Sequence, residues 1–473
     1  MTTDTDRAGT REEPLDLLGV GIGPFNLSLA ALADGVPGLR TAFLEQRPRF
    51  SWHPGLLIEG ATLQVPFLAD LVSLVEPTSP WSFLNYLKVR QRLFPFYFSE
   101  RFHVDRAEFD DYCRWVSESL PSCRFGHRVT QVRWEPDHRL FAVRYVREDV
   151  AGPARTCYAR HVVLGIGTAP HVPAPLRPLV DDPELPVLHS ADYVAWRDRL
   201  LSAGHVTVVG SGQSGAEVFL DLLRRRPVGA ERLTWLARTP AFAPMEYSKL
   251  GLEQFTPDYM RYFHGLPESV RDRLLPEQWQ LYKGVSVETL GEIHEELYRR
   301  TLGGGWPDAV LLPGAAVAAA ERVDGRIALT VTHAQQGSEA VLTTDAVVLA
   351  TGYAERPADP LLQPLLPHLA RDGSGRPRVD RAHRLVLDGD VEGSVFVQNA
   401  ERHTHGVGAP DLGLAAWRSA VILNTLTGRD VHPLPERTAF TRFGLAGLAA
   451  PDRGRAADQP RTEEEAAVTG TRP

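Results

Sequence analysis

The chain has few cysteines, no excess of positive charge and no long apolar run. Its 473 residues include three cysteines, Cys113, Cys123 and Cys157, whose spacing fits neither a metal site nor a disulfide framework. The formal charge of -8 argues against nucleic acid or an anionic membrane as the main partner. No apolar run reaches spanning length, and the polar, acidic start lacks the features of a signal peptide. We therefore expect a cytoplasmic protein that acts on small soluble ligands.

Length and composition predict a folded protein of two or three domains. Apolar residues make up 43% of the chain and charged residues 23%, which is ordinary for a globular protein with a large core. Residues 1–12 are polar, and residues 452–473 are rich in Arg, Glu, Ala and Pro. We predict that both ends are disordered tails.

The first motif is a glycine-rich turn within residues 16–30. An apolar run through Leu17 and Leu18 predicts a buried strand, and residues 25–33 have helical apolar spacing. Glycine lets the backbone approach a pyrophosphate, which free N–H groups and the positive end of the helix would bind. The turn residues assigned to this role are Gly19, Gly21, Gly23, Pro24 and Asn26.

A second strand supports a nucleotide site at this turn. Residues 41–45 end in Glu45, about twenty residues after the turn, where a carboxylate would bind a ribose hydroxyl. Without that acid, a glycine-rich loop between packed elements would remain a strong alternative. Because Asn26 replaces the third glycine of the usual fingerprint, we interpret the site as one for FAD.

A second glycine turn, at residues 205–217, predicts a site for a nicotinamide cofactor. A strand, an intact GxGxxG pattern and an amphipathic helix follow one another there, so the signal is more specific than at the first turn. The turn residues are Gly210, Ser211, Gly212, Gln213, Ser214 and Gly215. The next strand, at 233–238, ends in Arg238 rather than an acid. A cation at that place suits a 2'-phosphate and favours NADPH over NADH.

We predict an α/β fold with two Rossmann-like dinucleotide-binding domains and a small helical substrate-binding insert. A hairpin is expected within 129–147, and the strand at 161–170 would rejoin the first sheet. The strand within 345–353 would also return the chain to the first sheet, and Thr351 and Gly352 at its end are assigned to cofactor binding. The predicted FAD domain comprises 14–190 and 340–432, the NADPH domain 191–339, and the helical insert 241–303.

The last informative segment leads into a helix at 412–426, whose N-terminus would face the flavin or its phosphates. Asp411 precedes that helix and is assigned to the FAD site. His403 and His405 lie nearby, but no third ligand has suitable spacing, so no metal is expected.

Several motifs together resemble the microbial N-hydroxylating flavin monooxygenases of siderophore biosynthesis. The resemblance extends from about residue 14 to about residue 430. The segments that carry it are 21–30, 64–72, 77–87, 210–217, 255–257, 282–284, 350–353 and 404–406.

The resemblance implies an FAD- and NADPH-dependent enzyme, commonly a dimer or tetramer. Such enzymes insert one oxygen atom of O2 into the terminal primary amine of ornithine, lysine or an aliphatic diamine, and the product becomes an iron-binding hydroxamate. The resemblance places Gln64 beside the flavin ring as a catalytic and cofactor-binding residue. A disulfide reductase would need a close cysteine pair, which this chain lacks. A catalytically silent flavoprotein would make no hydroxylamine.

The substrate prediction rests on missing partners for a carboxylate. In ornithine-specific relatives, a lysine and two asparagines hold the substrate carboxylate, and Ala69, Leu252 and Ser286 stand at the matched positions. Because an unpaired buried carboxylate is costly, we expect cadaverine or putrescine as substrate, with L-lysine as the alternative. Glu246 or Glu253 would bind the distal ammonium of a diamine. Another cation, Lys249 or Lys283, would be needed for L-lysine.

Overall fold

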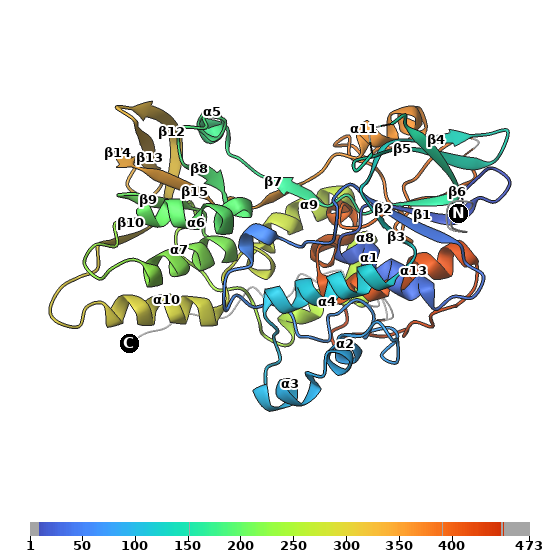
Figure 1. The fold of residues 1–473 in the computed structure, drawn as a ribbon, viewed down its shortest axis with the longest axis horizontal. Coiled ribbons are helices and arrows are strands. Elements are labelled where there is room, and N and C mark those ends of the chain that lie inside the picture. The colour runs from blue at the N-terminus through green and yellow to red at the C-terminus, as the bar shows by residue number, and fades with distance from the viewer. Residues whose placement is uncertain (1–8, 151, 390, 446–447, 449–473) are drawn as a thin grey trace, which may run out of the picture.

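The computed structural model describes residues 9–150, 152–389, 391–445 and 448, and it contains two lobes joined by a narrow connection (Figure 1). Each lobe is built on a sheet that carries one of the two glycine turns. The α/β class predicted from the sequence is confirmed.

The first lobe is built on a seven-stranded sheet of order β3-β2-β1-β6-β5-β4, with β17 also paired to β6. Strands β2, β1, β6 and β17 run parallel, whereas β4 and β5 form the expected hairpin against β6. Apolar runs at β1 and β6 are buried on both faces, as parallel strands require. The strands are β1 (Leu15–Val20), β2 (Thr41–Glu45), β3 (Cys123–Phe125), β4 (His127–Glu135), β5 (Leu140–Arg147), β6 (Arg155–Leu164) and β17 (Val395–Val397).

The helices of this lobe bring the end of the chain onto its beginning. Helix α13 packs against α1, so residues far apart in sequence share one core, to which α4 also contributes. The short helices α2 and α3 project at the lower edge of the view in Figure 1. The helices are α1 (Pro24–Asp34), α2 (Phe83–Val89), α3 (Leu93–Ser99), α4 (Arg106–Ser119), α11 (Asp359–Leu362), α12 (Arg402–His405) and α13 (Ala415–Thr427).

The second lobe contains a parallel five-stranded sheet of order β11-β10-β9-β15-β8 and a three-stranded antiparallel sheet of order β12-β13-β14. Residues 315–344 form the smaller sheet. The strands are β8 (Val187–His189), β9 (Val206–Val209), β10 (Leu233–Ala237), β11 (Ala309–Pro313), β12 (Ala315–Val323), β13 (Arg326–His333), β14 (Ser338–Thr344) and β15 (Ala346–Leu349). The helices are α5 (Arg177–Val180), α6 (Tyr193–Ser202) and α7 (Gln213–Arg225).

One strand prediction is wrong. Strand β15 does not return to the first sheet but lies between β9 and β8 in the second. Strand β8, which falls inside the predicted first FAD segment, also belongs to the second sheet. Both are short, buried apolar strands, and a strand buried on both faces carries no pattern that tells one parallel sheet from another.

Two chain crossings lie side by side between the lobes. Strand β7 (Thr168–Pro170) follows β6 where the chain leaves the first sheet. Strand β16 (Tyr353–Glu355) follows β15 where the chain leaves the second sheet, and it pairs antiparallel with β7. The predicted insert is helical, with α8 (Pro257–His264), α9 (Glu268–Glu277) and α10 (Val287–Arg299).

The predicted tails fall mostly outside the described residues, which include neither 1–8 nor 452–473. Residues 9–12 are described and contact the first lobe. Gly9 accepts a hydrogen bond from the Tyr158 backbone N–H, and Arg11 forms an ion pair with Glu135 at 2.9 Å. These four residues therefore do not form the disordered tail that their polarity suggested.

Candidate functional site

The first glycine turn leaves a gap in front of an uncapped helix. Gly21 has φ +89°, and a Cβ on it would lie 2.5 Å from the Gly165 carbonyl oxygen. Gly23 precedes α1, where a Cβ would meet nothing within 4 Å and no side chain caps the free N–H groups. An open space before free backbone donors fits a pyrophosphate.

Asn26 supports this turn from within the protein. Its buried side chain donates to the carbonyl oxygens of Val20 at 3.2 Å and Gly21 at 2.9 Å, and accepts from Gln398 Nε2 at 2.9 Å. A Cβ on Gly165 would lie 2.5 Å from Asn26 Cγ, so a glycine just after the neighbouring strand β6 makes room for the asparagine. The side chain thus supports the predicted FAD turn through hydrogen bonds to its backbone.

Glu45 lies at the end of β2, beside the same turn. One oxygen of its half-buried carboxylate accepts the Ile22 N–H at 2.9 Å, and the other accepts the Arg47 N–H at 3.0 Å. The structure therefore places the acid next to the predicted pyrophosphate cradle. Its assignment to a ribose hydroxyl stays a prediction.

The second turn has the same construction with tighter packing. Gly210 has φ +130°, and a Cβ on it would lie 2.1 Å from the Ala350 carbonyl oxygen. A Cβ on Gly215 would lie 2.3 Å from the Gly210 carbonyl oxygen. Helix α7 begins after Gly212 without a side-chain cap. Ser211 and Ser214 are half-buried at this turn, and their contact with a phosphate stays a prediction.

Gln213 and Ser286 bond to each other rather than standing free. Gln213 Oε1 accepts the Ser286 N–H at 2.8 Å, and Gln213 Nε2 donates to Glu217 and to Thr289 Oγ1, both at 3.0 Å. The Ser286 hydroxyl caps α10 by accepting the Thr289 N–H at 3.1 Å. Its hydroxyl is used within the protein, so a role for Ser286 in substrate binding stays a prediction with little structural support.

Three cations gather near the end of β10. Arg238 is exposed there, and Lys283 and Arg402 lie 5.3 and 5.6 Å from the centre of the Tyr282 ring. Partial burial lowers the pKa of Lys283, and the charges of Arg402 and Arg238 lower it further. A Glu355 carboxylate oxygen lies 3.9 Å from Arg402 Nε. This surplus of positive charge fits the predicted 2'-phosphate.

Gln64 lies in a segment that runs beside residues 102–104, which lead into α4. The Leu63 N–H donates to the Val104 carbonyl at 2.9 Å, and the Phe67 N–H donates to the Phe102 carbonyl at 2.9 Å. Within the described part of the chain, the half-buried Gln64 amide makes no protein hydrogen bond. It is therefore available to a ligand.

The sequence reading missed the role of Asp70, which fixes this segment. Its buried carboxylate accepts N–H groups from Val72 at 2.9 Å, Ser73 at 2.6 Å and Phe83 at 2.7 Å, and the Ser73 hydroxyl at 2.7 Å. Burial raises the pKa of Asp70, and these hydrogen bonds oppose the rise. A carboxylate inside an otherwise apolar segment was the available signal.

Ala69 lies beside the turn that begins α13. A Cβ on Gly413 would lie 2.8 Å from Asp411 Oδ1 and 3.9 Å from Ala69 Cβ. Asp411 accepts the Gly413 N–H at 2.7 Å, and burial raises the pKa of Asp411 to about 6. Asp411 therefore places a carboxylate near Ala69, at the position where ornithine-specific relatives carry a lysine.

The other predicted residues are more dispersed. Leu252 is 36% exposed in the insert, and Glu246 is exposed and accepts the Ser248 N–H. Lys249 is exposed, whereas both oxygens of Glu253 accept backbone N–H groups of Phe440 and Thr441. Among the described residues, Glu246 therefore has one carboxylate oxygen left for a substrate ammonium, whereas both oxygens of Glu253 accept backbone hydrogen bonds.

Thr351 and Gly352 follow β15 at the crossing between the lobes. The Thr351 hydroxyl donates to the His171 carbonyl, and Gly352 has φ +81°. The Gly352 carbonyl lies 3.0 Å from His189 Nε2. The Thr351 hydroxyl and the Gly352 carbonyl therefore join the two chain crossings. A contact of either residue with the cofactor stays a prediction.

A buried ion pair joins the two lobes and was not foreseen. Arg106 on α4 donates to both oxygens of Glu217 on α7, at 2.9 and 2.8 Å, and to the Leu56 carbonyl at 2.8 Å. Glu217 also accepts from Gln213, so the clamp is continuous with the second glycine turn. A carboxylate on the buried face of an amphipathic helix was the sequence signal.

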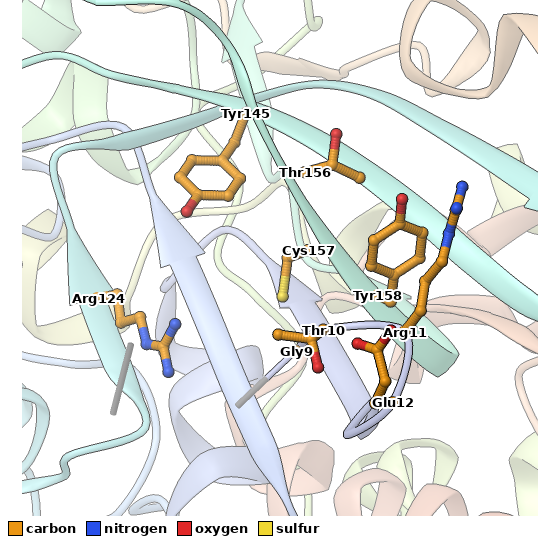
Figure 2. A pocket seen from close by; sticks show the side chains of 9 residues that line it. All are labelled: Gly9, Thr10, Arg11, Glu12, Arg124, Tyr145, Thr156, Cys157 and Tyr158. Carbon is orange, nitrogen blue, oxygen red and sulfur yellow. The ribbon is translucent and has the colours of Figure 1, made fainter. Parts of the chain in front are cut away.

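The pocket in Figure 2 is separate from this site. It is a shallow hollow of about 320 Å³ lined by Arg11, Arg124, Tyr145, Cys157 and Tyr158 among others, on the outer side of β6. Burial raises the pKa of the Cys157 thiol to about 11, so it is not a reactive thiolate. All three cysteines are free, and the described residues contain no cluster that could hold a metal ion.

Two nucleotide cradles on separate sheets, held together by a buried clamp, define a two-dinucleotide oxidoreductase. Residues 13–355 match the family model described as L-lysine 6-monooxygenase/L-ornithine 5-monooxygenase, and the chain belongs to that family of N-hydroxylating monooxygenases.

Similar proteins extend over most of the chain. The rhizobactin siderophore biosynthesis protein RhbE of Rhizobium meliloti is 43% identical, covering 91% of this chain and 95% of its own. A putrescine N-hydroxylase of Shewanella oneidensis is 40% identical over 92% and 85% of the two chains. The FAD-bound cadaverine monooxygenase DfoA of Erwinia amylovora has a TM-score of 0.86 and 37% identity, covering 91% and 98%. The ornithine N-hydroxylase KtzI of Kutzneria sp. 744, solved with reduced FAD and NADP+, has a TM-score of 0.81 and 30% identity, covering 88% and 99%.

Proposed function

We propose that this protein uses FAD, NADPH and O2 to hydroxylate the terminal amine of an aliphatic diamine, cadaverine or putrescine, for hydroxamate siderophore biosynthesis. The observation that carries the proposal is the pair of open glycine cradles on two clamped lobes. The putrescine and cadaverine enzymes among the relatives support the choice of substrate class.

The residues present fit both cofactors. The turn at Gly21 and Gly23, with Glu45, would hold FAD, and the turn at Gly210 and Gly212 would hold NADPH. When bound, the flavin supplies the redox chemistry that activates O2 with electrons from NADPH. The protein binds and orients the reactants and excludes water.

The substrate amine must be neutral to act as a nucleophile. An alkyl ammonium in water has a pKa of about 10.4, so desolvation in a pocket has to favour the neutral form near pH 7. Gln64, whose amide makes no hydrogen bond to another described residue, is the residue we assign to orienting the reactants beside the flavin. No side chain needs to act as a strong base in this scheme.

The surroundings of Ala69 favour a diamine over an amino acid. A substrate carboxylate there would meet the Asp411 carboxylate, and like charges repel; the cation that acts on Asp411, Arg418, is already paired with Glu401. The distal ammonium of a diamine would be attracted to Asp411 or to Glu246. L-lysine is the second candidate because Lys283 projects a cation from the insert. A reductase or a silent flavoprotein has no comparable support.

A four-substrate comparison tests the proposal. Hydroxylamine product and NADPH consumption should be measured separately with cadaverine, putrescine, L-lysine and L-ornithine. We expect product with at least one diamine at a higher kcat/KM than with either amino acid. Preference for an amino acid would refute the carboxylate argument, and NADPH oxidation without product from any amine would refute the hydroxylase proposal.

Coenzyme choice gives a second test. Arg238→Ala should raise the KM for NADPH much more than that for NADH, because a charge-assisted bond to the 2'-phosphate is lost. That bond contributes about 1–3 kcal/mol of binding free energy. Steady-state kinetics with both coenzymes measures this difference. Arg232→Ala, at the opposite end of β10, is the matched control and should change neither KM. Equal losses with both coenzymes would show that Arg238 does not bind the 2'-phosphate.

Domain organisation, location and assembly belong to the same proposal. We place the FAD domain in the first lobe, the NADPH domain in the second, and the substrate insert at 241–303. Free cysteines and the use of NADPH support a cytoplasmic enzyme. Among the described residues, no helix is both long and apolar enough to cross a bilayer. We also propose a homo-oligomer.

A further inference from the structure

Helix α3 and the residue beyond it carry an exposed aromatic ridge, composed of Phe94, Tyr97, Phe98 and Phe102. Their exposed fractions are 77%, 72%, 74% and 53%. Phe94, Tyr97 and Phe98 have the spacing of one helix face, and no residue of α3 is buried. Figure 1 shows α3 projecting away from both sheets.

The ridge is large enough to form the centre of a specific interface. The four rings together expose about 500 Å², which is near the upper limit of the largest apolar patch on a typical monomer. Covering the ridge with an identical copy would bury about 1,000 Å² before any rim is counted. Aromatic residues are also the side chains enriched at interface centres.

The charges at the two ends of α3 suit pairing with its own copy. At the first end, Arg90 lies 5.8 Å from the centre of the Tyr86 ring, and the described residues supply no carboxylate for it. At the other end, Glu100 is exposed and has no ion pair with a described residue. An antiparallel pair of α3 helices brings Glu100 of one copy beside Arg90 of the partner subunit.

We propose that the aromatic ridge is covered by a second copy of this chain in a two-fold symmetric interface. In such an interface the same patch serves both subunits, so both Arg90–Glu100 pairs form at once. An anionic membrane would attract the exposed Lys88 and Arg90 but repel Glu100, whereas a second copy pairs Glu100 with Arg90.

This interface would also support the Gln64 segment. The Phe67 ring contacts the rings of Phe96 and Phe102 at 5.4 and 5.8 Å, and the Phe67 N–H donates to the Phe102 carbonyl. Fixing the ridge therefore restrains the segment in which Gln64 lies. This last step rests on the role proposed for Gln64, whereas the interface itself does not.

The test measures the mass of the FAD-loaded protein by sedimentation over a range of micromolar concentrations. We expect an even-numbered assembly, and Phe94→Asp/Phe98→Asp should weaken it at least about a hundred-fold. Phe440→Asp, which changes a ring that is 87% exposed elsewhere, is the control and should leave the mass unchanged. A monomeric native protein, or an assembly unchanged by the double variant, would overturn the proposal.

A charge exchange keeps the test decisive if the aspartate variant fails to fold. Glu100→Arg alone should weaken the assembly about five-fold, and Arg90→Glu/Glu100→Arg should restore it. Absence of restoration would contradict the antiparallel arrangement. Flotation of the native monomer with phosphatidylserine vesicles, abolished in Phe94→Asp/Phe98→Asp, would assign the ridge to a membrane instead. These readouts need no amine substrate, so they are independent of the hydroxylase proposal.

Discussion

Glu217→Gln is expected to destabilise the protein by about 3–5 kcal/mol, because it leaves the buried Arg106 guanidinium without a counter-charge. Arg106 and Glu217 are both less than a tenth exposed and form two parallel hydrogen bonds. Their low exposure makes solvent a poor substitute for the lost partner. Chemical unfolding followed by flavin fluorescence measures the loss.

The same clamp should control transfer between the cofactors. Because Glu217 also holds Gln213 at the second turn, we expect slower reduction of FAD by NADPH in a stopped-flow experiment. Glu292→Gln removes the exposed ion pair with Arg224 on the outer side of α7 and should change stability by less than about 1 kcal/mol.

A double replacement separates the pair from its two members. Arg106→Met/Glu217→Met should cost less than the sum of the single replacements, because no unpaired charge remains. Additive losses would contradict a direct energetic coupling. Restored stability with slow flavin reduction would show that the clamp orients the lobes as well as stabilising them.

The two glycine turns could be predicted because their requirements are local. Gly21 and Gly210 have positive φ and leave no room for a Cβ, and each stands between a strand and a helix that the apolar pattern identifies. The sheet that receives β15 could not be predicted, because its pairing with β9 and β8 depends on residues far away in sequence. Local pattern determines an element more readily than its partner.

The hydrogen-bond partners of the polar residues could not be predicted for the same reason. The role of Asn26 at the cofactor stays a prediction. Its bonds to Gln398 and to the turn carbonyls, which join opposite ends of the chain, could not be predicted. Ser286 was matched to a substrate residue, yet its hydroxyl caps α10. A sequence shows that a polar residue is present, whereas only the fold shows whether its hydrogen bonds are already satisfied.

A buried charge network beside the first glycine turn, the predicted FAD site, gives the other large effect. Arg418 donates to the Gly408 and Ala409 carbonyls at 3.2 and 2.7 Å, and its guanidinium lies over the Phe25 ring at 4.9 Å. Arg418 and Glu401 are fully buried and 3.2 Å apart. This network therefore connects the first turn of α1 to the loop that carries Asp411.

Arg418→Met should weaken FAD retention and destabilise the protein by about 3–5 kcal/mol at neutral pH, because Glu401 loses its buried partner. Chemical unfolding and FAD release measure the two effects. Arg418→Lys keeps the charge and should retain part of the stability. Arg429→Met, which changes an exposed arginine beyond the end of α13, is the matched control and should have little effect.

The effect of Arg418→Met should depend on pH. Burial alone would raise the pKa of Glu401, but Arg418 and His383 hold that pKa below its usual value. The native ionised carboxylate therefore contributes stability above its unfolded pKa, and that contribution is lost as pH falls through its folded pKa. Without Arg418, burial raises the pKa of Glu401, so proton uptake relieves the unpaired charge at a higher pH.

The titratable groups around Arg418 also become easier to protonate when Arg418 is replaced, which reduces the stability loss at low pH. Burial and the charge of Arg418 lower the pKa values of His383 and His405, so the replacement favours their protonation beside Glu401. Asp411 loses a cation that lowers its pKa and also becomes easier to protonate. The stability difference between native protein and Arg418→Met should therefore be greatest near pH 8 and shrink toward about pH 5. A difference that is constant across this range would show that Arg418 acts through packing and hydrogen bonds rather than through its charge.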